Sequence, residues 1–172
     1  ISKNQKPRSL LVTGACGFIG SCFVRQAIEQ GDRVTVIDSL TYAGHKENLE
    51  GMSGPGKMQF VRGDICNGPL VAQLLKDNQV DALINFAAES HVDRSIDSPG
   101  AFIETNIRGV FTLLSASLAY WQDLPVEQKG DYRHLQVSTD EVYGSLGPTG
   151  KFSETTPMAP NSPYSSSKAA GD

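Results

Sequence analysis

The chain has 172 residues, of which 39% are hydrophobic and 20% charged, and its formal net charge is −4. This length suits one ordinary domain with a core of its own, and the mildly acidic balance argues against a nucleic-acid or membrane partner. The longest apolar stretch, 110–121, is too short to cross a bilayer. No secretory signal is visible, and three cysteines without a CxxC pair indicate free thiols in a reducing cytoplasm.

Apolar runs alternate with helical patterns along the whole chain. Strands are expected at residues 10–12, 33–37, 58–62, 81–86 and 132–138. Helices are expected at 21–30, 45–50, 69–78, 99–121 and from 162 onward. This alternation, without an internal repeat or boundary, predicts one α/β domain over residues 1–172, with a doubly wound parallel sheet in the order 3-2-1-4-5.

The helix expected at 99–121 is unusually apolar. It begins with Ser98 as a capping residue and Pro99 at the first helical position. Its apolar residues lie almost all round the helix: Phe102, Ile103, Ile107, Val110, Phe111, Leu113, Leu114 and Leu118. Because one face of a sheet cannot cover so broad a surface, part of this helix is predicted to contact another subunit.

Three glycines, Gly14, Gly17 and Gly20, lie between the first predicted strand and the first predicted helix. A strand, a glycine turn and a helix in this order are typical of a dinucleotide-binding unit. Without Cβ atoms, the turn lets a pyrophosphate reach the free N–H groups and the positive dipole end of the helix. The alternative is a tight turn that only packs the helix closely. Cys16 is interpreted as a small side chain beside the phosphate, with an oxidisable thiol as the alternative.

Acidic residues end the second and third predicted strands. Asp38 can accept hydrogen bonds from both ribose hydroxyls of an adenosine, and its charge would repel a 2′-phosphate, which favours NAD over NADP. Asp64 can meet the adenine amino group while Ile65 packs on the ring. The alternatives are an exposed loop acid at Asp38 and an ordinary strand-end turn at Asp64.

The segment 138–144 follows the fifth predicted strand and carries two adjacent carboxylates. In an open parallel sheet, this end of the strands is where ligands bind. Since a regular strand would send Asp140 and Glu141 to opposite faces, the backbone must leave strand geometry at about Thr139 if both serve one site. Taken without the other motifs, the segment is explained equally well by a solvated turn.

Tyr164 and Lys168 are four residues apart at the start of the last predicted helix, so they share one face. An ammonium nearby lowers the pKa of a tyrosine from its ordinary value by roughly 1 to 3 units, and a positive nicotinamide ring adds to the effect. The pair could therefore take a proton from a sugar hydroxyl while hydride passes to NAD. The Y-x-x-x-K pattern is common by chance and gains its meaning from the nucleotide signature upstream.

The three histidines do not cluster with acids or cysteines, so no metal site is predicted. His45 and His134 are interpreted as ordinary surface or strand-end residues. A site role for His91 stays open, because it follows the segment expected near the nicotinamide.

Five segments together resemble the extended short-chain dehydrogenase/reductases and, within them, the bacterial dTDP-glucose 4,6-dehydratases: 14–20, 38–44, 86–95, 138–144 and 164–168. The Thr-Asp-Glu at 139–141 is the most discriminating part, because similar epimerases and decarboxylases generally lack that acid pair. The resemblance implies a Rossmann-type domain with a retained NAD. It also implies that the NAD site includes, besides Tyr164, Lys168 and the glycines, Phe18, Ile19, Asp38, Ser39, Leu40, Thr41, Asp64, Ile65, Phe86, Ala87, Ala88, Glu89, Ser90 and Thr105.

The reaction that the resemblance implies is dehydration of dTDP-glucose to dTDP-4-keto-6-deoxyglucose. Tyr164 would deprotonate the C4 hydroxyl as hydride passes to NAD, while Thr139 and Lys168 hold the geometry. Glu141 would then remove the C5 proton, Asp140 would protonate the departing C6 hydroxyl, and the hydride would return to C6. The residues expected to touch the sugar are Ser90 and Thr139.

Members of this family carry a further C-terminal portion that grips the substrate nucleotide. Because the chain begins without Met and ends within its last predicted helix, we expect an N-terminal fragment that does not turn over alone. A homodimer is expected through the helix at 99–121 and the helix from 162. The alternatives are another NAD-dependent sugar-nucleotide epimerase or decarboxylase of the same fold, and a non-catalytic NAD-binding module.

Overall fold

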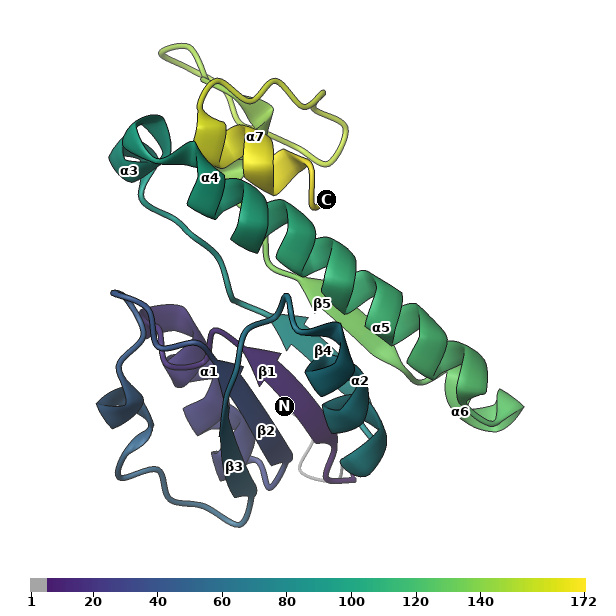
Figure 1. The fold of residues 1–172 in the computed structure, drawn as a ribbon. Coiled ribbons are helices and arrows are strands. Elements are labelled where there is room, and N and C mark those ends of the chain that lie inside the picture. Colours follow the sequence, from purple (N-terminus) through teal and green to yellow (C-terminus); the bar gives the residue numbers. More distant parts are fainter. Residues whose placement is uncertain (1–5) are drawn as a thin grey trace.

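The computed structural model describes residues 6–172 and contains a five-stranded parallel sheet in the order β3-β2-β1-β4-β5 (Figure 1). The strands are β1 Ser9–Thr13, β2 Arg33–Asp38, β3 Lys57–Arg62, β4 Ala82–Asn85 and β5 Arg133–Gln136. β1 pairs with both β2 and β4, so it forms the centre of the sheet. The order confirms the predicted doubly wound sheet.

Helices cover both faces of this sheet (Figure 1). Side chains alternate between the two faces of a strand, so Leu10 and Val12 of β1 join the cluster that contains α1 (Phe18–Glu29), whereas Leu11 joins the cluster that contains α2 (Gly68–Asp77). Every residue of β1 is buried. Because the strand is covered on both faces, its middle residues, 10–12, are all apolar, which explains why the alternating pattern of a half-exposed strand is missing from its sequence.

The helix expected at 99–121 is a long helical rod made of three segments. They are α4 Pro99–Phe102, a π-helical segment Ile103–Gly109, and α5 Val110–Asp123. The backbone keeps right-handed helical dihedrals at both junctions, so the rod is continuous. The expectation of a single regular helix was wrong in one respect: the middle of the rod is π-helical, a feature that is often found at functional sites.

One side of the rod is apolar and exposed. The large apolar side chains on it are Ile103, Phe111, Leu114, Leu118 and Trp121. The opposite side packs on the sheet through Leu113 and Tyr120 and lies against α2. The predicted subunit contact therefore has a candidate surface, and it stays a prediction.

The remaining elements are short. Two of them, α3 Val92–Asp97 and α6 Val126–Lys129, were not expected from the sequence. Two 3₁₀ turns occur at Lys46–Leu49 and Asp140–Tyr143, and α7 spans Pro163–Ala169. Figure 1 shows α3 and α7 grouped beside α4, beyond the carboxyl ends of the strands. Within residues 6–172, the helices are all too short or too polar to cross a membrane.

Candidate active site

A cavity of about 490 Å³ lies at the carboxyl ends of the strands, and we call it the main cavity because most of the predicted site residues line it. The glycine turn after β1, the segments that follow the other strands, and α7 form its wall. This is where ligands bind in open α/β sheets, beside the point where the chain order reverses around β1. Of the predicted cofactor residues, the wall contains Gly14, Gly17, Phe18, Ile19, Gly20, Asp38, Ser39, Thr41, Asp64, Ile65, Phe86, Ala87, Ala88, Glu89, Ser90, Thr105, Tyr164 and Lys168.

Leu40 is the predicted cofactor residue that the structure places outside this wall. Its side chain packs against the apolar cluster under α1, and its backbone is left-handed with φ of 57°. Val137, which the sequence did not single out, lines the cavity, and so does Ser138, the first residue of the segment 138–144. Thr139 and the two acids come directly after them in the chain and are not among the residues that line the cavity.

The glycine turn leaves the start of α1 open to the cavity. Gly14 has φ of 63°, and a Cβ on it would lie 2.5 Å from the backbone nitrogen of Ala87. The N-cap of α1 is Gly17, which has no side chain to bond the first amides of the helix. Those amides and the helix dipole are therefore available to an anion at this position. Cys16 is fully buried, and burial together with Asp38 raises its pKa to about 12, which agrees with a small packed side chain.

Asp38 is held at the end of β2 by two backbone amides. One carboxylate oxygen accepts from the Cys16 amide at 2.8 Å, and the other accepts from the Leu40 amide at 2.8 Å. A carboxylate has about four acceptor positions, so one position on each oxygen remains for a ligand hydroxyl. The carboxylate is 8% exposed and lies in the cavity wall, which fits its predicted role on a ribose.

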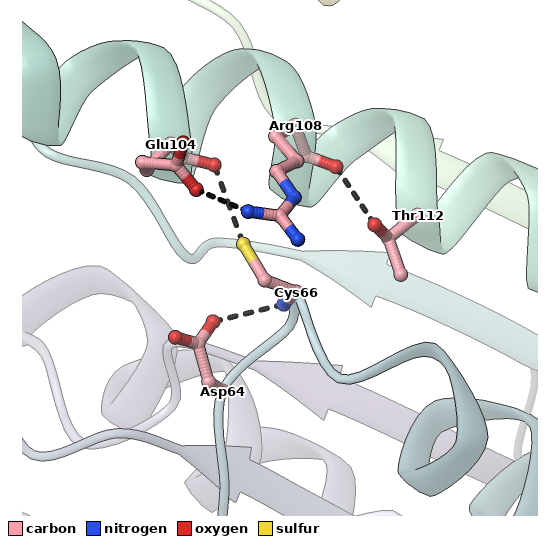
Figure 2. A network of polar contacts seen from close by, with 5 residues as sticks. All are labelled: Asp64, Cys66, Glu104, Arg108 and Thr112. Atoms are coloured by element: carbon pink, nitrogen blue, oxygen red, sulfur yellow. Dashed lines mark hydrogen bonds and ion pairs between the residues drawn. The ribbon is translucent and has the colours of Figure 1, made fainter.

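The loop that carries Asp64 is attached to the rod, as Figure 2 shows. Asp64 accepts from the Cys66 amide at 2.8 Å, and the Cys66 thiol donates to the Glu104 carbonyl oxygen at 3.3 Å. Burial raises the pKa of Cys66 to about 11, so the thiol keeps the proton that it donates. Glu104 also pairs with Arg108 at 2.9 Å on the surface of the rod. These contacts fix the loop beside Ile65 at the cavity wall.

The segment after β4 is held by buried amides. Asn85 accepts from Thr13 and from the Ala87 amide, and donates to the Gln136 side chain of β5 at 2.7 Å. Farther on, Asn106 of the π-helical segment donates to the Glu89 carbonyl and accepts from the Glu89 amide, both at 2.9 Å.

Asn106 has a further partner, the hydroxyl of Ser167 on α7, to which it donates at 2.9 Å. Asn106 is 1% exposed, so it is buried beneath the cavity wall. There it links the π-helical segment to the segment after β4 and to α7. Sequence reasoning missed it; the available signal was the one amide side chain among residues 99–121.

The two adjacent acids lie on one 3₁₀ turn. The backbone therefore leaves strand geometry at about Thr139, as predicted for two acids that serve one site. Thr139 still has extended dihedrals and caps the turn, because its hydroxyl accepts from the Glu141 amide at 3.3 Å. Asp140 is exposed and Glu141 is partly buried. The turn ends at Gly144, where φ is 87°.

α7 places Tyr164 and Lys168 in the cavity wall, and both are nearly buried. Ser162 and Ser165 form a capping box, and Pro163 occupies the first turn, so the start of this short helix is well defined. The Lys168 amine donates to the Val137 carbonyl oxygen at 2.6 Å. The helix therefore bonds directly to the segment that leads into the acid turn.

The pKa of Tyr164 moves opposite to the expected direction. Burial raises it, and the charges of Glu141 and Asp140 raise it further, while the neighbouring Thr139 side chain lowers it. Lys168 does not contribute to this shift, since its amine donates to the Val137 carbonyl oxygen, and the expected lowering by Lys168 and a nicotinamide ring stays a prediction. Burial also lowers the pKa of Lys168 itself.

The histidines behave differently from one another. His45 is exposed, as expected, and the His91 ring lies 5.8 Å from the ring of Tyr42. His134 is the second residue of β5, which agrees with the strand-end interpretation; its Nδ1 is 2.9 Å from the Ser117 hydroxyl, and burial between β5 and α5 lowers its pKa. Among residues 6–172, no group of histidine, cysteine and acidic side chains could hold a metal ion.

Comparison with known proteins matches residues 11–172 to the family described as GDP-mannose 4,6 dehydratase. A dTDP-glucose 4,6-dehydratase of Xanthomonas campestris pv. campestris is 58% identical over 162 residues, which are 94% of this chain and 46% of that protein. This chain therefore spans about half the length of the curated relatives that it matches.

Solved structures show the same likeness. The structure of DesIV, a dTDP-glucose 4,6-dehydratase from Streptomyces venezuelae with NAD and TYD bound, has a TM-score of 0.83 and 46% identity, covering 95% of this chain and 49% of that one. A UDP-glucose 4-epimerase from Thermotoga maritima with UDP-glucose has a TM-score of 0.79 and 29% identity, covering 95% and 48%. The sheet order, the position of the cavity and these matches agree: the chain has a Rossmann-type fold and belongs to the GDP-mannose 4,6 dehydratase family.

Proposed function

We propose that the protein dehydrates dTDP-glucose to dTDP-4-keto-6-deoxyglucose with a retained NAD. The observation that carries the proposal is the acid turn: Asp140 and Glu141 are adjacent on it, and both act electrostatically on Tyr164 in the cavity wall. The greater identity to dTDP-glucose 4,6-dehydratases, 58% and 46%, than to the epimerase, 29%, supports this choice of reaction.

The residues present fit NAD. The amides at the start of α1 are free to bind the pyrophosphate, and Asp38 has acceptor positions left for the ribose hydroxyls. A Cβ on Gly14 would come within 2.5 Å of the backbone at Ala87, so the turn is shaped for close backbone approach. When bound, NAD would accept a hydride from C4 of the sugar and return it to C6.

The chain's own residues would move the protons. Tyr164 would take the proton of the C4 hydroxyl, and a positive nicotinamide ring nearby would lower its pKa, which burial raises in the chain alone. Glu141 would remove the C5 proton, and Asp140 would give a proton to the C6 hydroxyl as it leaves. Lys168 would hold the segment at Val137 in register with α7.

The reaction is tested best in a chimera, because the chain spans about half of its relatives' length. Residues 11–172 replace the matching part of the Xanthomonas campestris enzyme, and the chimera is incubated with dTDP-glucose. We expect a product that has lost one water, identified by mass spectrometry. A product of unchanged mass would indicate an epimerase, and loss of carbon dioxide from a uronic acid substrate would indicate a decarboxylase. We expect residues 1–172 alone to bind NAD without turnover.

Two variants of the chimera separate the proposed roles. Tyr164→Phe should form no NADH from substrate, because the first proton acceptor is missing. Asp140→Asn should still form NADH but eliminate water about 10²–10⁴-fold more slowly, the usual contribution of a general acid. Unchanged turnover of Asp140→Asn would end the acid assignment. Tight NAD binding with no turnover by the unmodified chimera would favour a non-catalytic module.

We further propose that the exposed side of the rod and α7 form a homodimer face. The exposed apolar side chains of the rod run from Ile103 to Trp121 on one side of it. This is a large apolar surface for a monomer to leave in water. Phe111→Glu should convert a dimer into a monomer in light scattering, whereas an unchanged mass would contradict the proposal. Free thiols at all three cysteines agree with a cytoplasmic location.

A further inference from the structure

Two loops beside the main cavity contact each other through surface side chains. The guanidinium of Arg94 lies over the ring of Tyr42, 3.9 Å from its centroid, and the His91 ring lies on the same tyrosine at 5.8 Å. Tyr42 is 41% exposed, so this contact adds little to the core. Among residues 6–172 no carboxylate forms an ion pair with Arg94, so its charge is directed to the aromatic face.

The contact joins segments that follow two different strands of the sheet. Tyr42 follows β2, whereas His91 and Arg94 follow β4, and β1 lies between these two strands. The contact therefore crosses the end of β1, where the glycine turn begins. Figure 1 shows the backbone of α3 standing away from the loop after β2, so two long side chains bridge the space between them.

The contact is attached to the cavity wall on both sides without being part of it. Thr41 and Ala43, the neighbours of Tyr42, line the cavity, and so do Glu89 and Ser90 just before His91. Opening the cavity between these two segments would separate the stacked pair. Breaking the stack, in turn, would remove this link between the two segments.

We propose that Tyr42 and Arg94 form a latch that slows release of the dinucleotide from the main cavity, a role that rests on the proposed function. The chemistry gives such a latch a purpose, because the hydride taken at C4 must return to the same sugar before the reduced cofactor leaves. The latch acts on the walls of the cavity, so Tyr42 and Arg94 are positioning residues.

The expected size follows from the contact. An exposed cation–π pair of this kind corresponds to a change of roughly two- to fivefold in an equilibrium or rate constant. NADH should therefore leave Tyr42→Leu and Arg94→Gln about two- to fivefold faster than it leaves the parent chain. The double variant should be no faster than either single one, since both remove the same contact. Arg94→Lys should be intermediate, because an ammonium keeps the charge but loses the planar stack.

The experiment follows NADH fluorescence in a stopped-flow instrument while excess NAD displaces NADH from the chain. Lys129→Gln is the matched control, because Lys129 lies over Trp121 at 5.1 Å in a similar pair that is remote from the cavity. It should release NADH at the parent rate. Melting temperatures of all variants check that the fold is kept.

The possible outcomes distinguish a failure of the latch proposal from a failure of the proposed cofactor. Parent-like release from Tyr42→Leu would overturn the latch, even if Arg94→Gln bound NADH more slowly and with a weaker salt dependence, because that pattern reports only the arginine's charge. Faster release from Lys129→Gln as well would also overturn it. Failure of the parent chain to bind NADH would overturn both the latch and the proposed cofactor.

Discussion

Gly109 is where the rod passes closest to the loop proposed to bind adenine. A Cβ at this position would lie 2.4 Å from Cδ1 and 2.7 Å from Cγ1 of Ile65, where ordinary contacts are 3.4–4 Å. Gly109→Ala therefore forces the Ile65 side chain to move by about 1 Å, the difference between 3.4 and 2.4 Å. Because Ile65 lies in the cavity wall, its movement changes the surface offered to the adenine ring.

The magnitudes predict weaker binding together with an unchanged or lowered stability of the fold. Alanine is favoured over glycine in a helix by about 1 kcal/mol, whereas overpacking costs about 1–3 kcal/mol. The net change in folding free energy should therefore lie between none and a loss of about 2 kcal/mol. Losing one methyl contact with adenine costs about 0.8 kcal/mol, which is roughly a fourfold increase in Kd.

The assay is titration calorimetry with ADP-ribose, which carries the adenosine half of NAD, together with thermal unfolding. Gly100→Ala is the matched control: Gly100 lies on the same rod, and a Cβ there would meet no atom within 4 Å. The control should gain stability and bind ADP-ribose like the parent. If Gly109→Ala left both the melting temperature and the ADP-ribose affinity unchanged, the packing of the rod on Ile65 would be refuted.

The remaining predictions concern single side chains. Iodoacetamide at pH 8 should label exposed Cys22 and spare buried Cys16, whose pKa is raised to about 12, and equal labelling of the folded chain in mass spectra would contradict that burial. Burial lowers the pKa of His134 from 6.5, so its contribution to stability is present above that pH and is lost as the pH falls below it. His134→Gln should therefore reduce the acid sensitivity seen in urea titrations, and an identical pH slope would argue against the assignment. Asp38→Asn weakens two charge-assisted bonds from backbone amides and should reduce the preference for NADH over NADPH, which a pair of fluorescence titrations measures.

The sheet could be predicted because buried parallel strands leave a simple pattern. Runs such as 10–12 and 34–37 are buried on both faces and mostly apolar, and helices between them leave few possible strand orders. The elements that were missed have no such pattern. α3 is six residues long, its one buried residue is Ser95, and it packs against α4 and α7, so tertiary contacts stabilise it. The π-helical turns are also invisible, because apolar spacing cannot separate π from α geometry.

The residues that line the cavity could be predicted because they lie at strand ends. The pKa values and buried hydrogen bonds within the cavity wall could not be predicted. Asp38 and Tyr164 are where the motifs place them. The pKa of Tyr164, however, depends on burial and on which acceptor Lys168 reaches, and neither follows from spacing along the sequence. Asn106 was missed for the same reason, since its importance lies in partners 17 and 61 residues away.

The acid turn shows why the backbone, more than the residue types, makes a shared site possible. On β5 two consecutive side chains would point in opposite directions, whereas in a 3₁₀ turn of three residues they diverge by about 120°. The chain changes from one geometry to the other immediately after Thr139, so Asp140 and Glu141 both come to act on Tyr164. Extended geometry continued from Thr139 through Glu141 would keep the same sequence motif and remove one acid from the site. The change of geometry at Thr139 is therefore as necessary to the proposed dehydration as the two carboxylates.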